Sequence, residues 1–198
     1  MTTDNTDAAA PGAGVTIRQE RSDDHPAVHA LHLAAFGGEE RVAALADALR
    51  SAEAPLAPVS FVATVDGQVV GQVLLSAGRL DAPRQIVNVL VLSPLGVLPE
   101  FQDQGIGTRL IKHALAAADA RHVPLVFLEG SPHYYAQRGF ERADTLGFRS
   151  PSLRIPPPAF QVVRLSAHEP WMTGTLVYSD TFWALDCVGL RDTEASTG

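Results

Sequence analysis

Two glycines, Gly105 and Gly107, lie where a β-rich run gives way to the clearest helical pattern in the chain. The first amides of a helix have no acceptors within the helix, and together with the helix dipole they attract anions. A residue without a side chain lets a phosphate approach the backbone closely, and Thr108 adds a hydroxyl. The turn is therefore predicted to hold an anion, and a diphosphate is the natural ligand for it.

Other motifs with a similar glycine pattern do not fit this turn. The dinucleotide-binding fingerprint needs a third glycine where this chain has Leu110. The nucleoside-triphosphate loop needs Gly-Lys-Ser/Thr, the serine-hydrolase turn needs Gly-x-Ser-x-Gly, and the chain contains neither. What remains is Gln102-x-x-Gly105-x-Gly107, after an extended run that ends at Val97.

This segment resembles the acyl-CoA-binding motif of the GNAT superfamily of N-acetyltransferases, in which Gln/Arg-x-x-Gly-x-Gly/Ala follows a strand. The resemblance implies acetyl-CoA as the co-substrate. It implies that backbone groups near Val97 and Leu98 pair with the pantetheine arm as an added strand would. It further implies that the pyrophosphate is held by the turn and the helix start, at Gln102, Asp103, Gln104, Gly105, Ile106, Gly107 and Thr108.

A second segment strengthens the resemblance. Tyr135-Ala136-Gln137-Arg138-Gly139-Phe140 is similar to the family's Tyr-x-x-x-Gly-Phe element, whose tyrosine faces the acetyl-CoA sulfur and can protonate the leaving thiolate. This implies Tyr135, and not its neighbour Tyr134, as the catalytic acid. The resemblance covers about residues 15–165 and is strongest to a bacterial branch of predicted N-acetyltransferases without assigned substrates. It implies direct acetyl transfer to an amine of a small molecule or peptide, with the Val97 amide facing the developing oxyanion.

Two residues of the turn depart from the family pattern. Asp103 stands where glycine is usual, and Gln104 stands where Arg or Lys is frequent. An inward-pointing carboxylate would weaken the binding of a diphosphate, so the departure bears on affinity for coenzyme A. No motif identifies the general base. Glu129 and His133 are the nearest candidates, and a chain of water molecules can also carry the proton away.

Other interpretations of these residues remain open. The glycine turn is also compatible with a plain helix start, and Tyr135 with a packed aromatic side chain. At the level of the whole chain, the alternative function is an acyl-CoA-binding sensor or an inactive relative that kept the cleft, and a third is a structural partner protein. His25, His29 and His32 share one helical face, but no Cys or carboxylate completes a recognisable zinc site. We therefore expect a polar helix flank there and no metal.

The elements that must position the motifs follow from apolar periodicity. Strands are expected at 15–19, 59–65, 68–77, 85–98, 123–128, 140–143, 160–165 and 174–178, and helices from Ser22 or Asp23 to Phe36, at 39–50, at 105–121 and around 132–138. This order predicts an α/β fold with a mixed sheet covered by helices. The resemblance implies that the central sheet is mostly antiparallel and that helices flank it.

Length and composition set the remaining expectations. Residues 1–14 are expected to form a disordered tail and residues 15–165 the N-acyltransferase domain. Residues 166–198 are expected to form a strand-rich addition packed on the same domain or on a partner subunit, which makes a homodimer possible. A formal charge of −7 disfavours nucleic-acid binding. Cys187 is the single cysteine, expected as a small buried residue and not a nucleophile. The absence of a long apolar run and of a signal-peptide pattern predicts a cytoplasmic protein without membrane contact.

Overall fold

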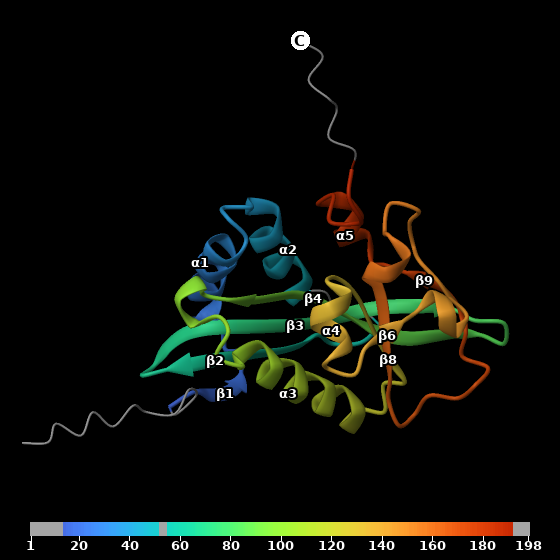
Figure 1. Cartoon of the computed structure of the whole chain (residues 1–198), viewed down its shortest axis with the longest axis horizontal. Helices are drawn as coiled ribbons and strands as arrows, with labels where there is room; N and C mark the ends of the chain where they lie inside the picture. Colours follow the sequence, from blue (N-terminus) through green and yellow to red (C-terminus); the bar gives the residue numbers. More distant parts are fainter. Residues whose placement is uncertain (1–13, 52–54, 192–198) are drawn as a thin grey trace, which may run out of the picture.

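One twisted sheet organises the computed structural model, which describes residues 14–51 and 55–191 (Figure 1). The sheet begins with an antiparallel series of β1 (Thr16–Gln19), β2 (Val59–Val65), β3 (Gln68–Asp81) and β4 (Ile86–Val97). Asp66 and Gly67 join β2 to β3 with φ angles of 48° and 84°. The two-residue turn of a hairpin requires such positive angles, which explains the sequence at this point.

The sheet continues beyond β4 with a change of direction. β5 (Leu125–Glu129) pairs with β4 in parallel, and β8 (Phe160–Arg164) and β6 (Glu141–Arg142) follow in antiparallel order. At the far end of β3, β9 (Gly174–Val177) pairs with β3 and with β7 (Phe148–Arg149). The expected mixed, mostly antiparallel sheet is confirmed.

Helices cover both faces of the sheet. Figure 1 shows α1 (His25–Ala35) and α2 (Glu40–Arg50) on one face and α3 (Ile106–Ala120) on the other. The predicted apolar stripe of α3 is confirmed, since Ile106, Leu110, Ala114 and Ala118 are all buried. β3 is buried along most of its length because both of its faces are covered. The described chain also contains two short helices, α4 (Pro132–Ala136) and α5 (Asp180–Ala184). Short 3-10 turns lie at Ser22–Asp24, Pro99–Phe101, Asp144–Leu146 and Pro157–Ala159.

The pairing of β4 with β5 is short. It consists of two residue pairs, Leu90 opposite Val126 and Val91 opposite Phe127, although both strands continue beyond them. Beyond that point β4 stays with β3, whereas β5 stays with β8. β4 carries one extra residue relative to β3 between Leu92 and Leu95, and such a bulge bends a strand. The two central strands therefore separate at the end where the sequence motifs lie.

The C-terminal part of the described chain joins the same core. Leu176, Tyr178, Phe182 and Val188 are buried in one cluster with residues of β3, β4 and β5. This part supplies one strand and one short helix, and the sequence pattern did not indicate α5. The expected tail at residues 1–14 lies almost entirely outside the described residues. Among the helices of residues 14–51 and 55–191, none is long and apolar enough to cross a membrane.

The expected polar flank of α1 is wrong at one position. His32 is fully buried, and its Nε2 lies 2.8 Å from Oε1 of Gln72 on β3. Burial lowers the pKa of the His32 imidazole, which keeps the ring neutral inside the core. His29 instead contacts the Asp47 carboxylate at 2.7 Å. The histidines thus have separate partners, and no group of three metal-binding side chains occurs within the described ranges.

Candidate functional site

The turn before α3 has the backbone shape that an anion site requires. Asp103 and Gly105 have φ angles of 58° and 78°, in the left-handed region. The first backbone bond of the helix runs from the Arg109 amide to the Gly105 carbonyl. The amides of Ile106 through Thr108 precede this bond, and in a helix start such amides point outward along the axis. The site therefore presents a row of N–H groups at the positive end of the helix dipole.

A cleft of about 450 Å³ lies over this helix start, between the end of β4 and α4. Seven of the nine residues expected to bind the cofactor line it, namely Val97, Gln102, Asp103, Gly105, Ile106, Gly107 and Thr108. The other two residues do not. The Leu98 amide donates to the Val70 carbonyl at 2.9 Å, and the Gln104 side chain donates to the Glu100 carbonyl at 3.2 Å. The structure thus brings most of the expected cofactor residues to one cleft.

Arg138 is a cleft residue that the sequence interpretation missed. Its Nε donates to the Thr108 hydroxyl at 3.0 Å, and its guanidinium lies 3.5 Å from the centre of the Tyr134 ring. Arg138 and Asp103 are the charged residues that line the cleft among those described. Arg109, which belongs to the same stretch as the glycines, instead donates to the Val15 carbonyl at 2.7 Å. A signal was present, because position 138 lies inside the Tyr-x-x-x-Gly-Phe element itself.

Tyr134 gives Gly107 a second physical role. A Cβ atom at Gly107 would overlap the Tyr134 hydroxyl, so the missing side chain lets this ring lie against the helix start. Burial raises the pKa of the Tyr134 phenol, and the nearby Arg138 cation partly opposes that shift. The neutral hydroxyl of Tyr134 and the guanidinium of Arg138 therefore both lie beside the start of α3, where a ligand in the cleft would contact them.

Tyr135 lies deeper than Tyr134. Its ring makes edge-to-face contacts with Tyr134 and Phe140, with centroids 5.0 and 5.7 Å apart. A Cβ at Gly130 would overlap the Tyr135 ring, so that glycine permits the close approach. Burial raises the pKa of the Tyr135 phenol, which keeps the hydroxyl protonated at neutral pH and able to donate.

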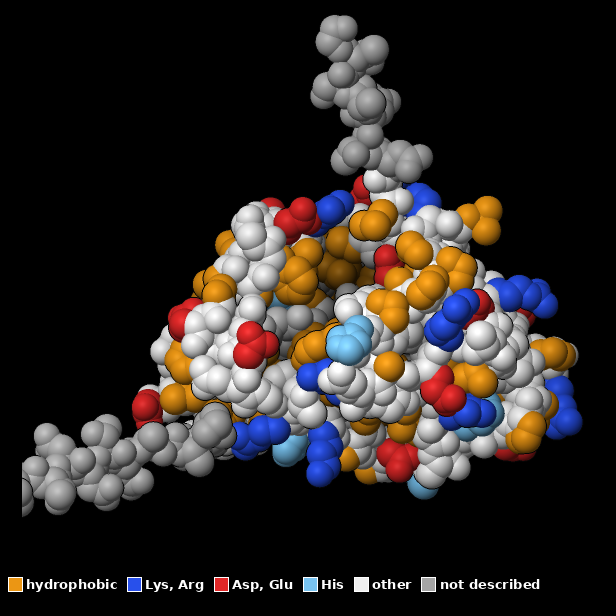
Figure 2. All heavy atoms as spheres, viewed as in Figure 1, with side chains coloured by type: hydrophobic (Ala, Val, Ile, Leu, Met, Phe, Trp, Pro, Cys, Tyr) orange, Lys and Arg blue, Asp and Glu red, His pale blue; other side chains and the backbone are white. Residues whose placement is uncertain are grey.

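A second hollow, of about 550 Å³, opens on the other side of Tyr135. Its walls come from α2, β4, β5 and the segment after β9, and the space-filling view shows hydrophobic side chains around a depression between α2 and α5 (Figure 2). The cleft and this hollow share three lining residues, Leu95, Ser131 and Tyr135. The separation of β4 from β5 therefore creates two compartments that meet at Tyr135.

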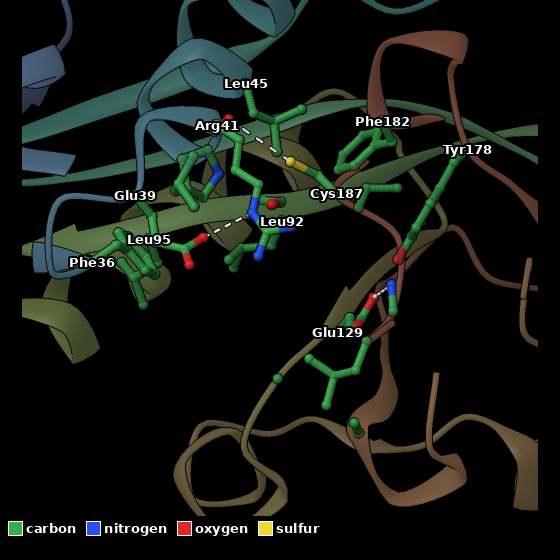
Figure 3. Close-up of a pocket in the computed structure, with 18 of the residues that line it drawn as sticks. Phe36, Glu39, Arg41, Leu45, Leu92, Leu95, Glu129, Tyr178, Phe182 and Cys187 are labelled. Carbon is green, nitrogen blue, oxygen red and sulfur yellow. Dashed lines mark hydrogen bonds and ion pairs between the residues drawn. The ribbon is translucent and has the colours of Figure 1, made fainter. Parts of the chain in front are cut away.

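The two candidate bases lie in different surroundings. Glu129 lines the hollow, and its Oε2 accepts the Gly189 N–H at 3.1 Å (Figure 3). Burial raises the pKa of the Glu129 carboxyl, while that N–H and the charge of Arg154 partly oppose the shift. His133 is exposed, contacts Gln137 at 3.2 Å, and lines neither compartment.

Cys187 also lines the hollow and is only half-buried, although the sequence suggested a buried residue. Burial nevertheless raises the pKa of its thiol, which therefore stays protonated at neutral pH. A protonated thiol is a poor nucleophile.

Comparisons with known proteins agree with this architecture. Residues 16–143 match the sequence model of an acetyltransferase (GNAT) domain. An uncharacterised N-acetyltransferase of Escherichia coli K12, YjhQ, is 30% identical over 131 residues, which are 64% of this chain and 67% of that protein. The solved structure of the GNAT family N-acetyltransferase YhbS from Escherichia coli, in complex with CoA, has a TM-score of 0.74 at 28% identity, over 85% of this chain and 91% of that one. A GNAT family acetyltransferase from Brucella melitensis, in complex with acetyl-CoA, has a TM-score of 0.67 at 28% identity, over 85% and 97% of the two chains.

Proposed function

Because this chain belongs to the GNAT family of acetyltransferases, we propose that it transfers the acetyl group of acetyl-CoA directly to an amine of a small molecule or peptide. The protein is an acyltransferase, and acetyl-CoA is its co-substrate. The single observation that carries the finer proposal is the meeting of two compartments at Tyr135. A reaction between two bound substrates needs such a junction.

The cleft fits the coenzyme. Helix-start amides and the Arg138 guanidinium supply donors for a diphosphate, and Gly105 leaves open space beside them. The end of β4 near Val97 lies along the cleft and offers backbone groups to the pantetheine arm. This placement puts the thioester beside Leu95, Ser131 and Tyr135, with the amine arriving from the hollow.

Tyr135 then acts as the catalytic acid. The amine nitrogen forms a bond to the thioester carbonyl carbon, the carbon–sulfur bond breaks, and the Tyr135 hydroxyl protonates the leaving sulfur. We assign the developing oxyanion to the backbone amide of Val97. Preorganised donors of this kind stabilise charge that appears only in the transition state.

A thiol-release assay with acetyl-CoA and a panel of primary amines tests the proposal. The wild-type protein should release coenzyme A only when an amine is present. Binding of acetyl-CoA without release would identify an acyl-CoA sensor. A melting temperature unchanged by acetyl-CoA would point to a structural partner protein, because a ligand at 100 times its Kd stabilises the folded state by about 2.7 kcal/mol.

A further inference from the structure

Glu129 is a carboxylate that lines the second hollow, to which the proposed function assigns the acceptor amine. It follows four fully buried residues of β5, Leu125 through Leu128. One of its oxygens accepts a backbone N–H from Gly189. Within residues 14–51 and 55–191, no Lys, Arg or His side chain forms an ion pair with it. A partly buried carboxylate with one neutral donor has room for a cationic partner.

The other charged groups of the hollow already have partners. Arg41 pairs with Glu39 at 2.8 Å, and both side chains are about half exposed, at 54% and 49%. Asp186 pairs with Arg191 at 2.7 Å and with Arg154 at 3.7 Å. Figure 3 shows the Glu39–Arg41 pair on one side of the hollow and Glu129 on the other, with Leu92 and Phe182 nearby. Glu129 is therefore the acidic group best able to receive a ligand charge.

The rest of the hollow favours an apolar ligand body. Its walls include Phe36, Leu45, Leu92, Leu95 and Phe182. The volume of about 550 Å³ lies inside the range of roughly 300–1,000 Å³ that is usual for small-molecule sites. A polyamine or an aminosugar carries further donors, and the other carboxylates that line the hollow, those of Glu39 and Asp186, are already paired with arginines.

On the premise of the function proposed above, we propose that the acceptor is a small primary amine with an apolar body, and that Glu129 is the general base. The carboxylate pairs with the ammonium group and takes one of its protons, which later passes to solvent. The neutral nitrogen attacks the thioester carbon, and the carbon–sulfur electron pair moves to sulfur, which takes the Tyr135 proton. The nitrogen then loses its second surplus proton, which returns to Tyr135 through water. The products are an amide, a thiol and one proton.

Several groups face Glu129 and shape its titration. Arg154 approaches it from the loop before β8, Tyr178 from the end of β9, and Cys187 from the segment after α5. Burial raises the pKa values of Tyr178 and Cys187, so both stay neutral at neutral pH. The raised pKa of Glu129 lies closer to the operating pH of a base than that of an ordinary exposed carboxyl.

Glu129→Gln tests the assignment, with Glu141→Gln as the matched control, because Glu141 forms only an exposed ion pair with Arg164. Thiol release would be measured with 2-phenylethylamine, hexylamine, spermidine and a dipeptide amide. We expect the apolar amines to have the highest kcat/KM, and Glu129→Gln to lower that value by roughly 100-fold or more at pH 7. In Glu129→Gln the fall in kcat/KM at acid pH should disappear, while its Kd for acetyl-CoA should equal that of the wild type. The control variant Glu141→Gln should keep the wild-type kcat/KM.

The outcomes separate this inference from the proposed function. If the wild type releases no thiol with any amine, the proposed function fails and the inference fails with it. If the wild type is active but Glu129→Gln keeps its rate and its acid limb, only the inference is overturned. A preference for spermidine or the dipeptide amide would overturn the assigned substrate class. If Glu129→Gln melts below the assay temperature, Glu129→Asp replaces it and should keep the acid limb at a reduced rate.

Discussion

Arg138→Gln should weaken the binding of acetyl-CoA roughly two- to thirtyfold. Among the described residues, Arg138 is the cation that lines the cleft. It faces the start of α3, and the turn before that helix carries the acidic Asp103. A hydrogen bond to a charged group contributes about 1.5–3 kcal/mol. On binding, the guanidinium would give up its bond to Thr108, about 0.5–1.5 kcal/mol, and part of its contact with Tyr134, about 0.5–1 kcal/mol. The net loss of binding free energy on substitution is then about 0.5–2 kcal/mol, and 1.4 kcal/mol is tenfold in Kd.

The assay is calorimetric titration of acetyl-CoA and of S-acetylpantetheine, which has the thioester arm but no diphosphate. Arg142→Gln is the matched control, because Arg142 pairs with Asp144 on the exposed surface and does not line the cleft. Arg138→Gln should lose affinity for acetyl-CoA and none for S-acetylpantetheine. Equal losses for both ligands, or no loss for either, would refute the assignment of Arg138 to the diphosphate.

Four further outcomes follow from the same geometry. Tyr135→Phe should lower kcat by roughly 100-fold or more with an unchanged Kd for acetyl-CoA, as measured by thiol release and calorimetry; an unchanged kcat would remove the hydroxyl from the chemistry. Asp103→Gly should tighten acetyl-CoA binding about fivefold, since it removes a carboxylate worth about 1 kcal/mol at 4 Å in water and suits the left-handed backbone; unchanged binding would show that the carboxylate points away from the diphosphate. The hydrogen bond from Arg18 lowers the pKa of the Asp24 carboxyl. The stabilisation from this ion pair is present above the unfolded pKa of about 3.9 and is lost as the pH falls through the folded pKa. The difference in melting temperature between the wild type and Asp24→Asn should therefore be large at pH 7 and vanish at acid pH, and a difference independent of pH would contradict this. Burial raises the pKa of the Glu129 carboxyl, so the stability of the folded state falls as the pH rises from the unfolded pKa through the raised folded pKa. Glu129→Gln should therefore melt higher than the wild type at pH 8 and at the same temperature at pH 4. A lower melting temperature of the variant at pH 8 would contradict a destabilising ionised Glu129.

Local patterns predicted much of the fold because they encode local geometry. The Asp66–Gly67 pair indicated a two-residue hairpin turn, and both residues have the positive φ angles that such a turn needs. The apolar spacing of α3 predicted the face that is buried. A turn was expected around Gln102, Gly105 and Gly107, and Gly105 has the positive φ angle that a glycine adopts readily. Each of these features is decided within a few residues of chain.

The site could be predicted only in part, because its remaining features depend on segments that are distant in the sequence. Leu80 on β3 pairs with Leu176 on β9, and this pairing brings the C-terminal segment to the hollow. The choice between Glu129 and His133 rests on the hollow, which Glu129 lines and His133 does not, and whose walls come from segments between residues 36 and 190. The burial of His32 depends on Gln72, forty positions away. No local spacing carries this information.

A crystal structure of the protein with acetyl-CoA would locate both ends of the coenzyme. We predict diphosphate oxygens within hydrogen-bonding distance of the amides at residues 105–108, and the thioester sulfur facing the Tyr135 hydroxyl where the cleft meets the hollow. Coenzyme density in another part of the molecule, or a sulfur turned away from Tyr135, would contradict it.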